Sequence, residues 1–330
     1  MKNSIFMTML AASVMMASCA KTEIDTVGKR SPDDGKIGVT FSVETPLTKA
    51  TVASDADMTV QSIQVFVFLG NNLDVYGSNT GNSLTVQCTP GQREIYVLAN
   101  APALDKITTK SALLETASQL RHSSVKDCNS FEMIGSSTET LSLSNTNITI
   151  PIRHITSRIV VSSIKKQFKS AALEALEFKV VNMYLVNVAG DCTYGGVSAP
   201  TIWYNKLADC NEIPEIVKDK VDAVVTASKP HTATHTFYAY PNPTGADSDS
   251  DTWSPRYTRL VIETKLGDDT FYYPISLPMI ESNKSYNISE IKITRPGSTS
   301  PDKPVSYLDC SFSVSVEPWT SVTWTEGTTI

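Results

Sequence analysis

The sequence predicts an all-β protein made of two antiparallel β-sandwiches in tandem. Three observations predict this fold class. Apolar residues recur at every second position in many short segments, Pro- and Gly-containing turn signals separate these segments, and helical periodicity is scarce. Beyond a leader of 18 residues, 312 of the 330 residues remain (330 − 18). That length accommodates two domains of about 100–200 residues each.

The leader, residues 1–18, has one lysine, then an apolar run over residues 5–17, then small residues directly before Cys19. This pattern is typical of a secretory signal, and the run is shorter than the ~20 residues that span a bilayer. Its end resembles a bacterial lipoprotein signal. The resemblance implies that Cys19 becomes the first residue of the mature chain and carries a lipid. The alternative is an ordinary signal cut near Ala17 or Ala20.

Residues 19–36 are polar and read as a tether. The first strand expected after it covers residues 39–43. Residues 63–69 are apolar on both faces, which predicts a central strand. The other expected strands are 84–88, 94–99, 147–152, 157–162, 176–188, 234–240, 257–264, 270–277, 285–294 and a last segment, 307–324. A short helix is expected at 111–120, with Thr109 or Ser111 as N-cap, and residues 171–177 are either a second short helix or the start of a strand.

The charged and then small-residue segment 163–172 marks the expected domain boundary. The sequence therefore divides into a signal peptide (1–18), a propeptide with the first strand (19–49), an N-terminal sandwich (50–168) and a C-terminal sandwich (169–330).

Cysteine usage leaves the disulfide pattern open. Apart from Cys19 the chain has five cysteines, so in an exported protein at least one thiol is free or pairs between chains. Cys88–Cys128 and Cys192–Cys210 are candidate bridges. There is no CxxC and no Cys/His cluster at zinc spacing, so we expect no cofactor.

An acidic loop carries Asp247, Asp249 and Asp251 in alternation. Three carboxylates at this spacing could surround a calcium ion, but the glycine and the distal glutamate of an EF-hand loop are missing. A solvated acidic loop is the preferred interpretation.

His231 and His235 could share a zinc ion on a helix. The β-branched residues around them favour a strand instead, which would separate them by about 13 Å. We therefore expect no metal site here, and we expect His122 and His154 to be surface or structural residues.

The composition also excludes function classes. The net charge is −6, and −7 after loss of the leader with its single lysine, and no basic patch suggests nucleic acid. No serine has the strand–turn–helix context of a nucleophile elbow, and no glycine-rich phosphate loop is present. We expect no catalytic residues and no enzyme activity.

One combination of features points to assembly. Val39, Phe41 and Val43 form a short amphipathic strand, and the polar loop behind it, residues 45–57, has a single basic residue, Lys49. Such loops are where proteases cut. Loss of the first strand would open a groove lined by unpaired backbone groups, which another chain's strand could fill by β-augmentation. Such a head-to-tail contact does not close on itself and generates a filament.

In this order, and behind such a leader, several segments resemble the fimbrillins, the type V pilus subunits of Bacteroidales. The segments that carry the resemblance are residues 62–69 with Tyr76, residues 86–102, Phe131, Glu132, Met133 and Gly135, residues 152–161 with Arg153 and Arg158, and residues 316–319. The most distinctive is VQCTPGQREIYVLANAP at 86–102. The resemblance covers essentially all of residues 19–330.

The resemblance implies two transthyretin-like sandwiches of Greek-key topology. It implies a lipid on Cys19, export to the surface of the outer membrane, and cleavage between Lys49 and Ala50 by a trypsin-like surface protease. The processed chain would join other fimbrial subunits in a fimbrium, with a host or bacterial surface ligand. The displaced strand would be Val39, Phe41 and Val43, and the donor strand would comprise Phe312, Val314, Val316, Trp319, Val322 and Trp324.

The better-known members are cut after arginine, whereas this loop offers only lysine. A cut after Arg30 would leave the first strand in place.

Within this family a stalk subunit is favoured, and a tip or an anchor subunit is the alternative. A different class is a monomeric surface lipoprotein that binds glycans through aromatic side chains. The candidates for such stacking are Trp203, Tyr204, Trp253, Tyr257, Tyr272 and Tyr273.

Overall fold

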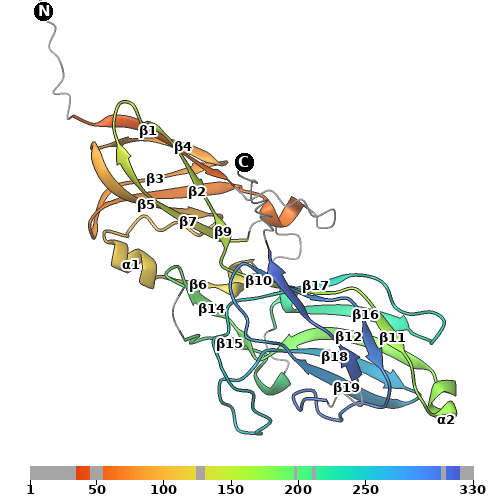
Figure 1. Cartoon of the computed structure of the whole chain (residues 1–330). Coiled ribbons are helices and arrows are strands. Elements are labelled where there is room, and N and C mark those ends of the chain that lie inside the picture. Colours follow the sequence, from red (N-terminus) through yellow and green to blue (C-terminus); the bar gives the residue numbers. More distant parts are fainter. Residues whose placement is uncertain are drawn as a thin grey trace, which may run out of the picture. The chain divides into compact units, whose positions relative to one another are not determined.

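The computed structural model describes residues 35–44, 55–123, 131–196, 199–209, 213–305 and 310–319. Almost all of its regular structure is β-strand, so the all-β prediction is confirmed (Figure 1). The described helices are α1 (Lys110–Glu115), α2 (Ala171–Ala175) and the 3-10 turns η1 (Asp55–Met58), η2 (Leu120–Ser123), η3 (Lys206–Ala208) and η4 (Glu215–Val217). Neither α-helix has the length that a membrane-spanning helix needs, and none is found elsewhere in the described ranges.

The first group of strands forms two facing sheets. One has the order β4-β1-β8, from β1 (Ile37–Glu44), β4 (Ser83–Cys88) and β8 (Asn147–Pro151). The other has the order β3-β2-β5-β7-β9, from β2 (Ser62–Leu69), β3 (Asn72–Thr80), β5 (Gly91–Ala99), β7 (Met133–Leu141) and β9 (Arg153–His154). Apolar side chains of both sheets share one core cluster, which makes this group a sandwich.

The central position expected for residues 63–69 is confirmed, because β2 pairs with β3 on one side and with β5 on the other. Val65 and Val67 point into the core between the two sheets. Phe66 and Phe68, on the opposite face, belong to a second cluster shared with later strands.

The second group of strands also has two main sheets. One has the order β17-β10-β20-β23, from β10 (Ser157–Val161), β17 (His235–Ala239), β20 (Lys284–Ile288) and β23 (Ser315–Pro318). The other has the order β16-β12-β18-β19, from β12 (Phe178–Val186), β16 (Lys218–Val224), β18 (Arg259–Leu266) and β19 (Asp269–Ser276). Smaller sheets join β11 (Ile164–Lys166), β21 (Ile291–Ile293) and β22 (Cys310–Phe312), β13 (Val188–Ala189) and β15 (Trp203–Tyr204), and β6 (Ala117–Gln119) and β14 (Asp191–Thr193).

Three strand pairs in these mainly antiparallel sheets are parallel. β1 runs parallel to β8, β10 to β20, and β11 to β21. In both groups the first strand lies between one antiparallel and one parallel neighbour. Parallel neighbours need a long connection. In each group that connection is supplied by all the intervening strands.

The helix expected at residues 111–120 was too long. Thr109 caps α1, since its hydroxyl accepts a hydrogen bond from the backbone N–H of Ala112, but α1 ends at Glu115. Residues 117–119 are instead paired with β14, so a tertiary contact overrides local helix propensity. The short helix α2 is as expected, with Ser170 as its N-cap.

The sequence suggested a solvated acidic loop, but one of its three aspartates is paired with a buried arginine. Asp247 accepts a hydrogen bond from Arg259 at 2.6 Å, and Asp302 binds both Arg259, at 2.6 Å, and Arg256, at 3.2 Å. Both guanidinium groups are fully buried. Arg256 also donates to backbone carbonyls of residues 248–254, so it holds the loop in shape. Asp249 and Asp251 remain exposed.

Replacing Asp302 by alanine is expected to lower the free energy of unfolding by about 3–5 kcal/mol, because two buried cations would lose their shared carboxylate. Urea unfolding of the mature chain measures this. The matched control is Asp249→Ala in the same loop, where the side chain is exposed and the change should stay within about 0.5 kcal/mol. Equal, small effects of the two changes would contradict the prediction.

Of the cysteines, Cys88 and Cys192 are buried free thiols, and Cys128 and Cys210 lie outside the described residues. Burial raises the pKa of both Cys88 and Cys192 to about 11. Since the thiolate is the reactive form, these two side chains act as small apolar core residues.

Candidate strand-exchange site

β1 is a central strand that fills a slot between two others (Figure 1). On one side Val39 and Phe41 lie opposite Val86 and Leu84 of β4 in an antiparallel ladder. On the other side Phe41 lies opposite Ile148 of β8 in a parallel ladder. Removal of β1 would therefore expose backbone donors and acceptors on both flanking strands.

The alternation read from the sequence explains how β1 is held. Val39 and Phe41 are 0% exposed and belong to the core cluster between the two sheets, whereas Val43 is half-buried near the end of the strand. On the outer face Thr40 exchanges a hydroxyl hydrogen bond with Thr85 at 2.8 Å. Each fully buried side chain contributes roughly 1.5–3 kcal/mol through removal of apolar surface from water.

Three residues of the predicted processing sequence, Cys19, Lys49 and Ala50, lie outside the described residues. β1 ends at Glu44, and the next described element is η1, which begins at Asp55. Lys49 thus lies in the loop that joins β1 to η1 along the chain. A cut there would break the backbone between β1 and η1.

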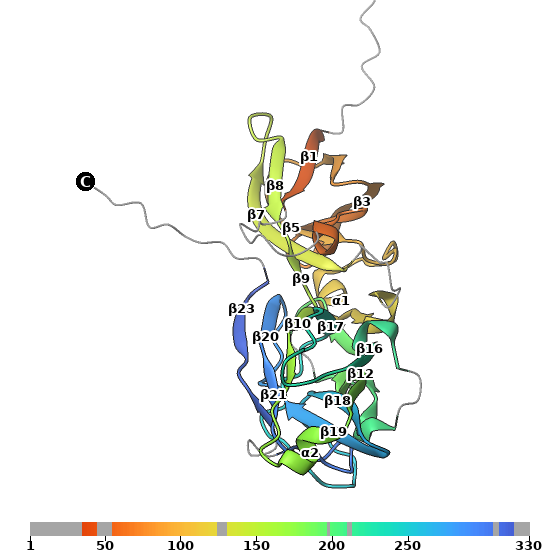
Figure 2. The same cartoon turned by 90° about the vertical axis from the view of Figure 1, so that its right-hand side faces the viewer.

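The predicted donor residues lie in the chain's own sheets. Phe312 belongs to β22 and pairs with Ile291, and Val316 belongs to β23 and pairs with Tyr286 at the edge of a sheet (Figure 2). Phe312 and Val314 are half-buried, whereas Val316 is 46% exposed. The remaining predicted donor residues, Val322 and Trp324, lie outside the described residues. The donor role stays a prediction, and for β22 and β23 it requires release from β21 and β20.

Trp319 anchors this C-terminal segment. Its ring is 2% exposed and stacks on the imidazole of His154 with 3.9 Å between ring centroids. Phe131 packs against it edge-on and Arg158 lies 5.4 Å from its ring centroid. Its backbone N–H donates to the carbonyl of Asn283 at 2.9 Å. Trp319 directly follows β23, so the contacts of its ring in this cluster favour the pairing of β23 with β20. We call this paired arrangement the closed position of β23.

The same cluster contacts Asp57, which follows the loop with the predicted cleavage site. Nε2 of His154 lies 2.7 Å from the backbone carbonyl oxygen of Asp57, and the Asp57 carboxylate accepts a hydrogen bond from Tyr238. Burial lowers the pKa of His154 to about 4, so the ring is neutral near pH 7 and donates to that carbonyl. Burial also raises the pKa of Asp57. Sequence reasoning missed this cluster because its members come from distant segments without a shared local pattern.

The two histidines expected to lie about 13 Å apart are in fact adjacent. His231 forms an isolated bridge with Ile164, residues 232–234 are not in a strand, and β17 begins only at His235. The Nε2 atoms of His231 and His235 are 2.7 Å apart. The spacing of a regular strand therefore does not apply to this segment.

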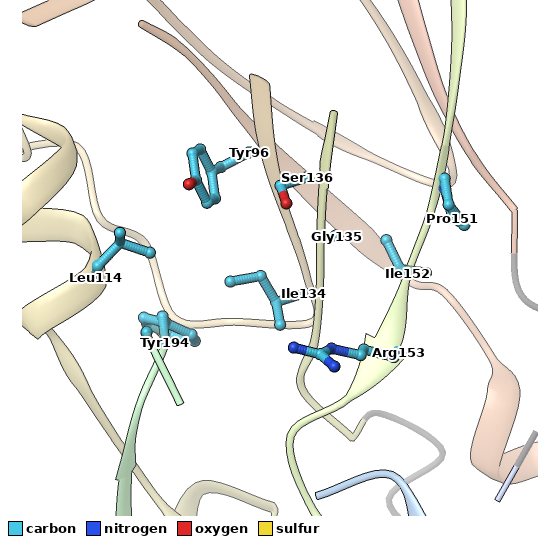
Figure 3. A pocket seen from close by; sticks show the side chains of 10 residues that line it. Tyr96, Leu114, Ile134, Gly135, Ser136, Pro151, Ile152, Arg153 and Tyr194 are labelled. Carbon is cyan, nitrogen blue, oxygen red and sulfur yellow. The ribbon is translucent and has the colours of Figure 1, made fainter. Parts of the chain in front are cut away.

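A separate pocket of about 480 Å³ lies beside β5, β7 and β9 (Figure 3). The Arg153 side chain reaches toward Ile134 and Tyr194 there. Gly135 is required at this place, because a Cβ would lie 2.3 Å from the carbonyl oxygen of Pro151. The sequence contains no pattern that indicates this pocket.

The aromatic residues considered for glycan stacking do not form one platform. Tyr204 and Tyr273 are buried in the core and offer no free face. Trp203 and Trp253 contact each other at 5.4 Å between centroids, and Lys206 lies over the Trp253 ring.

Comparison with known proteins gives a consistent result. Residues 37–158 match the sequence profile of the family described as "Major fimbrial subunit protein (FimA)". The curated protein "Major fimbrium subunit FimC" of Porphyromonas gingivalis is 28% identical over 203 residues, which are 59% of this chain and 41% of that protein. The match thus spans about two fifths of the length of that relative.

Solved structures share the fold. A candidate cell-adhesion protein of Bacteroides eggerthii superposes with a TM-score of 0.64 at 17% identity, covering 86% of this chain and 96% of that one. The fimbrilin FimA of Porphyromonas gingivalis W83 superposes with a TM-score of 0.59 at 16% identity, covering 86% and 97%. The predicted fold class is therefore confirmed. The resemblance to fimbrillins predicted from the sequence is confirmed by the profile match over residues 37–158 and by the curated relative, and the solved structures show the shared fold.

Proposed function

We propose that this protein is a structural subunit of a cell-surface fimbrium and polymerises by donor-strand exchange. The observation that carries the proposal is the position of β1, which lies between two strands of a sheet and is followed along the chain by the loop with Lys49. The profile match over residues 37–158 and the matched curated relative, a fimbrium subunit, support the fimbrial role. No enzymatic role is proposed.

In the proposed order of events, the exported precursor carries a lipid on Cys19 at the outer membrane, with β1 in place. A surface protease then cuts after Lys49, and β1 leaves the slot between β4 and β8. The open groove presents two unpaired backbone edges and the holes left by Val39 and Phe41. A strand of the next subunit that restores both ladders recovers this apolar burial.

The donor would be the C-terminal segment of another subunit. Two arrangements are compatible with the closed position of β22 and β23. Either these strands swing out after Trp319 leaves its cluster, or residues 320–330 with Val322 and Trp324 act as the donor while β23 stays in place. The first arrangement suits a stalk subunit that opens on assembly. A tip subunit would keep β23 closed permanently.

We also propose that the fold comprises two domains whose boundary lies near residues 155–156. β9 is the last strand paired within the first group, and β10 is already paired with β17 and β20. The boundary would thus lie ahead of the segment 163–172 that composition suggested.

The experiment that tests the proposal is mass spectrometry of the N-terminus of the protein taken from the native cell surface. A chain that starts at Ala50 is expected. Lys49→Gln should then keep β1 attached and abolish detergent-resistant ladders, and Lys36→Gln, in the tether before β1, is the matched control that should assemble normally. A native chain that still starts at a lipidated Cys19 would contradict processing and indicate an anchor subunit or a monomeric lipoprotein.

A further inference from the structure

His231, His235 and Asp219 form a connected group among the C-terminal strands. The two Nε2 atoms lie 2.7 Å apart, and the imidazole rings are inclined by 26°. On the opposite side of the His235 ring, Nδ1 lies 2.7 Å from a carboxylate oxygen of Asp219. The group joins two sheets, because His235 begins β17 and Asp219 belongs to β16.

This arrangement matches the way proteins prepare histidine for metal binding. A carboxylate that accepts the Nδ1 hydrogen leaves Nε2 as the lone-pair donor and fixes the orientation of the ring. In His235 that lone pair points at Nε2 of His231. Two imidazole nitrogens at Zn–N distances of 2.0–2.1 Å around a tetrahedral ion are roughly 3.3 Å apart. The rings would have to separate by only about 0.6 Å.

We infer that His231 and His235 form a two-histidine site for a borderline divalent cation such as Zn²⁺, with Asp219 as the positioning residue. Water would complete the coordination, since the described residues contain no cluster of three or more His, Cys, Asp or Glu side chains suited to a metal. Imidazole ligands suit Zn²⁺, Cu²⁺ and Ni²⁺ and do not suit Ca²⁺ or Mg²⁺.

The surroundings allow such an ion. His231 is half-buried, so an ion could reach the pair from solvent on its side. His235 is 7% exposed and is fixed by the surrounding protein. Lys218 and Lys220 flank Asp219 in sequence, but the alternation along β16 exposes both lysines and turns Asp219 the other way. The backbone of His231 pairs with Ile164 independently of its side chain. Substitution of that side chain therefore leaves the local fold intact.

Titration of the mature chain with Zn²⁺ by calorimetry tests the inference. His231→Gln is expected to weaken the tightest Zn²⁺ site at least tenfold, and Asp219→Asn about tenfold through loss of ring positioning. His122→Gln is the matched control and should leave Zn²⁺ binding unchanged. The cysteine thiols are common to all variants, so the difference between the chains reports the histidine pair.

A second measurement separates binding from folding defects. Zn²⁺ should raise the melting temperature of the wild-type and His122→Gln chains, Ca²⁺ should not, and His231→Gln should melt normally without Zn²⁺ yet gain nothing from it. Equal Zn²⁺ binding by wild-type and His231→Gln would overturn the inference, as would the absence of any Zn²⁺ effect on the wild-type chain. In that case the two rings would form only a structural hydrogen bond.

Discussion

Replacing Phe41 by alanine is expected to lower the free energy of unfolding of the unprocessed chain by about 3–5 kcal/mol, the usual cost of truncating a buried phenylalanine. Phe41 is 0% exposed and lies opposite Leu84 on one side and Ile148 on the other. Urea unfolding of residues 19–330 measures the change. Glu44→Ala, in the same strand with an exposed side chain, is the matched control and should change stability by less than about 0.5 kcal/mol.

The Phe41→Ala substitution also tests whether β1 is a permanent part of its sheet or a strand that leaves the sheet after cleavage. If β1 must leave the groove after cleavage at Lys49, a weaker hold on β1 should speed its departure. We therefore expect the cleaved Phe41→Ala chain to polymerise faster than the cleaved wild type, although its precursor is less stable. Slower or unchanged polymerisation of a chain shown to be cleaved would count against β1 as the displaced strand.

Replacing Trp319 by alanine is expected to cost about 3–5 kcal/mol and to release β23 from the edge of its sheet. The ring contacts His154, Phe131 and Arg158 and is almost fully buried, whereas β23 itself is exposed along its whole length. Hydrogen exchange of the β23 amides should therefore rise sharply. Trp253→Ala, which removes a half-buried tryptophan outside this cluster, is the control and should leave exchange of the β23 amides unchanged. Protected β23 amides in the Trp319→Ala chain would show that strand pairing alone holds this segment.

The Trp319 cluster should also be sensitive to acid. Because burial lowers the pKa of His154 to about 4, against about 6.5 for an unfolded histidine, its stabilising contribution is complete above pH 6.5. That contribution is lost as the pH falls toward 4, by at most about 3 kcal/mol. Burial raises the pKa of Asp57, so the contribution of Asp57 to the free energy of unfolding decreases as the pH rises, opposite to that of His154. The measurement is therefore the difference in pH dependence between wild type and His154→Phe, which should show the histidine slope alone.

Local pattern was enough to predict many of the strands but missed others, among them β3, β7 and β16. Alternation of apolar and polar residues located β1, because a strand with one buried face carries apolar side chains at every second position. The doubly apolar segment 63–69 also predicted its own central position, since both of its faces had to be covered. The loop behind β1 is visible in the sequence because small and polar residues interrupt the pattern of strands there.

Pairing partners and clusters were not predictable in this way. No local pattern announces that β1 lies parallel to β8, that residues 117–119 pair with β14, or that Asp247 lies against a buried Arg259. His231 and His235 show the limit most directly. Their spacing predicts a long separation on a regular strand, and three residues outside the strand bring the two rings into contact.

By itself the sequence determined the fold class, the position of the first strand, the loop with Lys49 behind it and the resemblance to fimbrillins. Each of these depends on residues that are neighbours along the chain. Only the tertiary structure decided that Trp319, directly after β23, packs against His154 and that His235 of one sheet contacts Asp219 of another. These contacts join side chains from distant segments, and their energies depend on burial and orientation that arise only when the sheets pack.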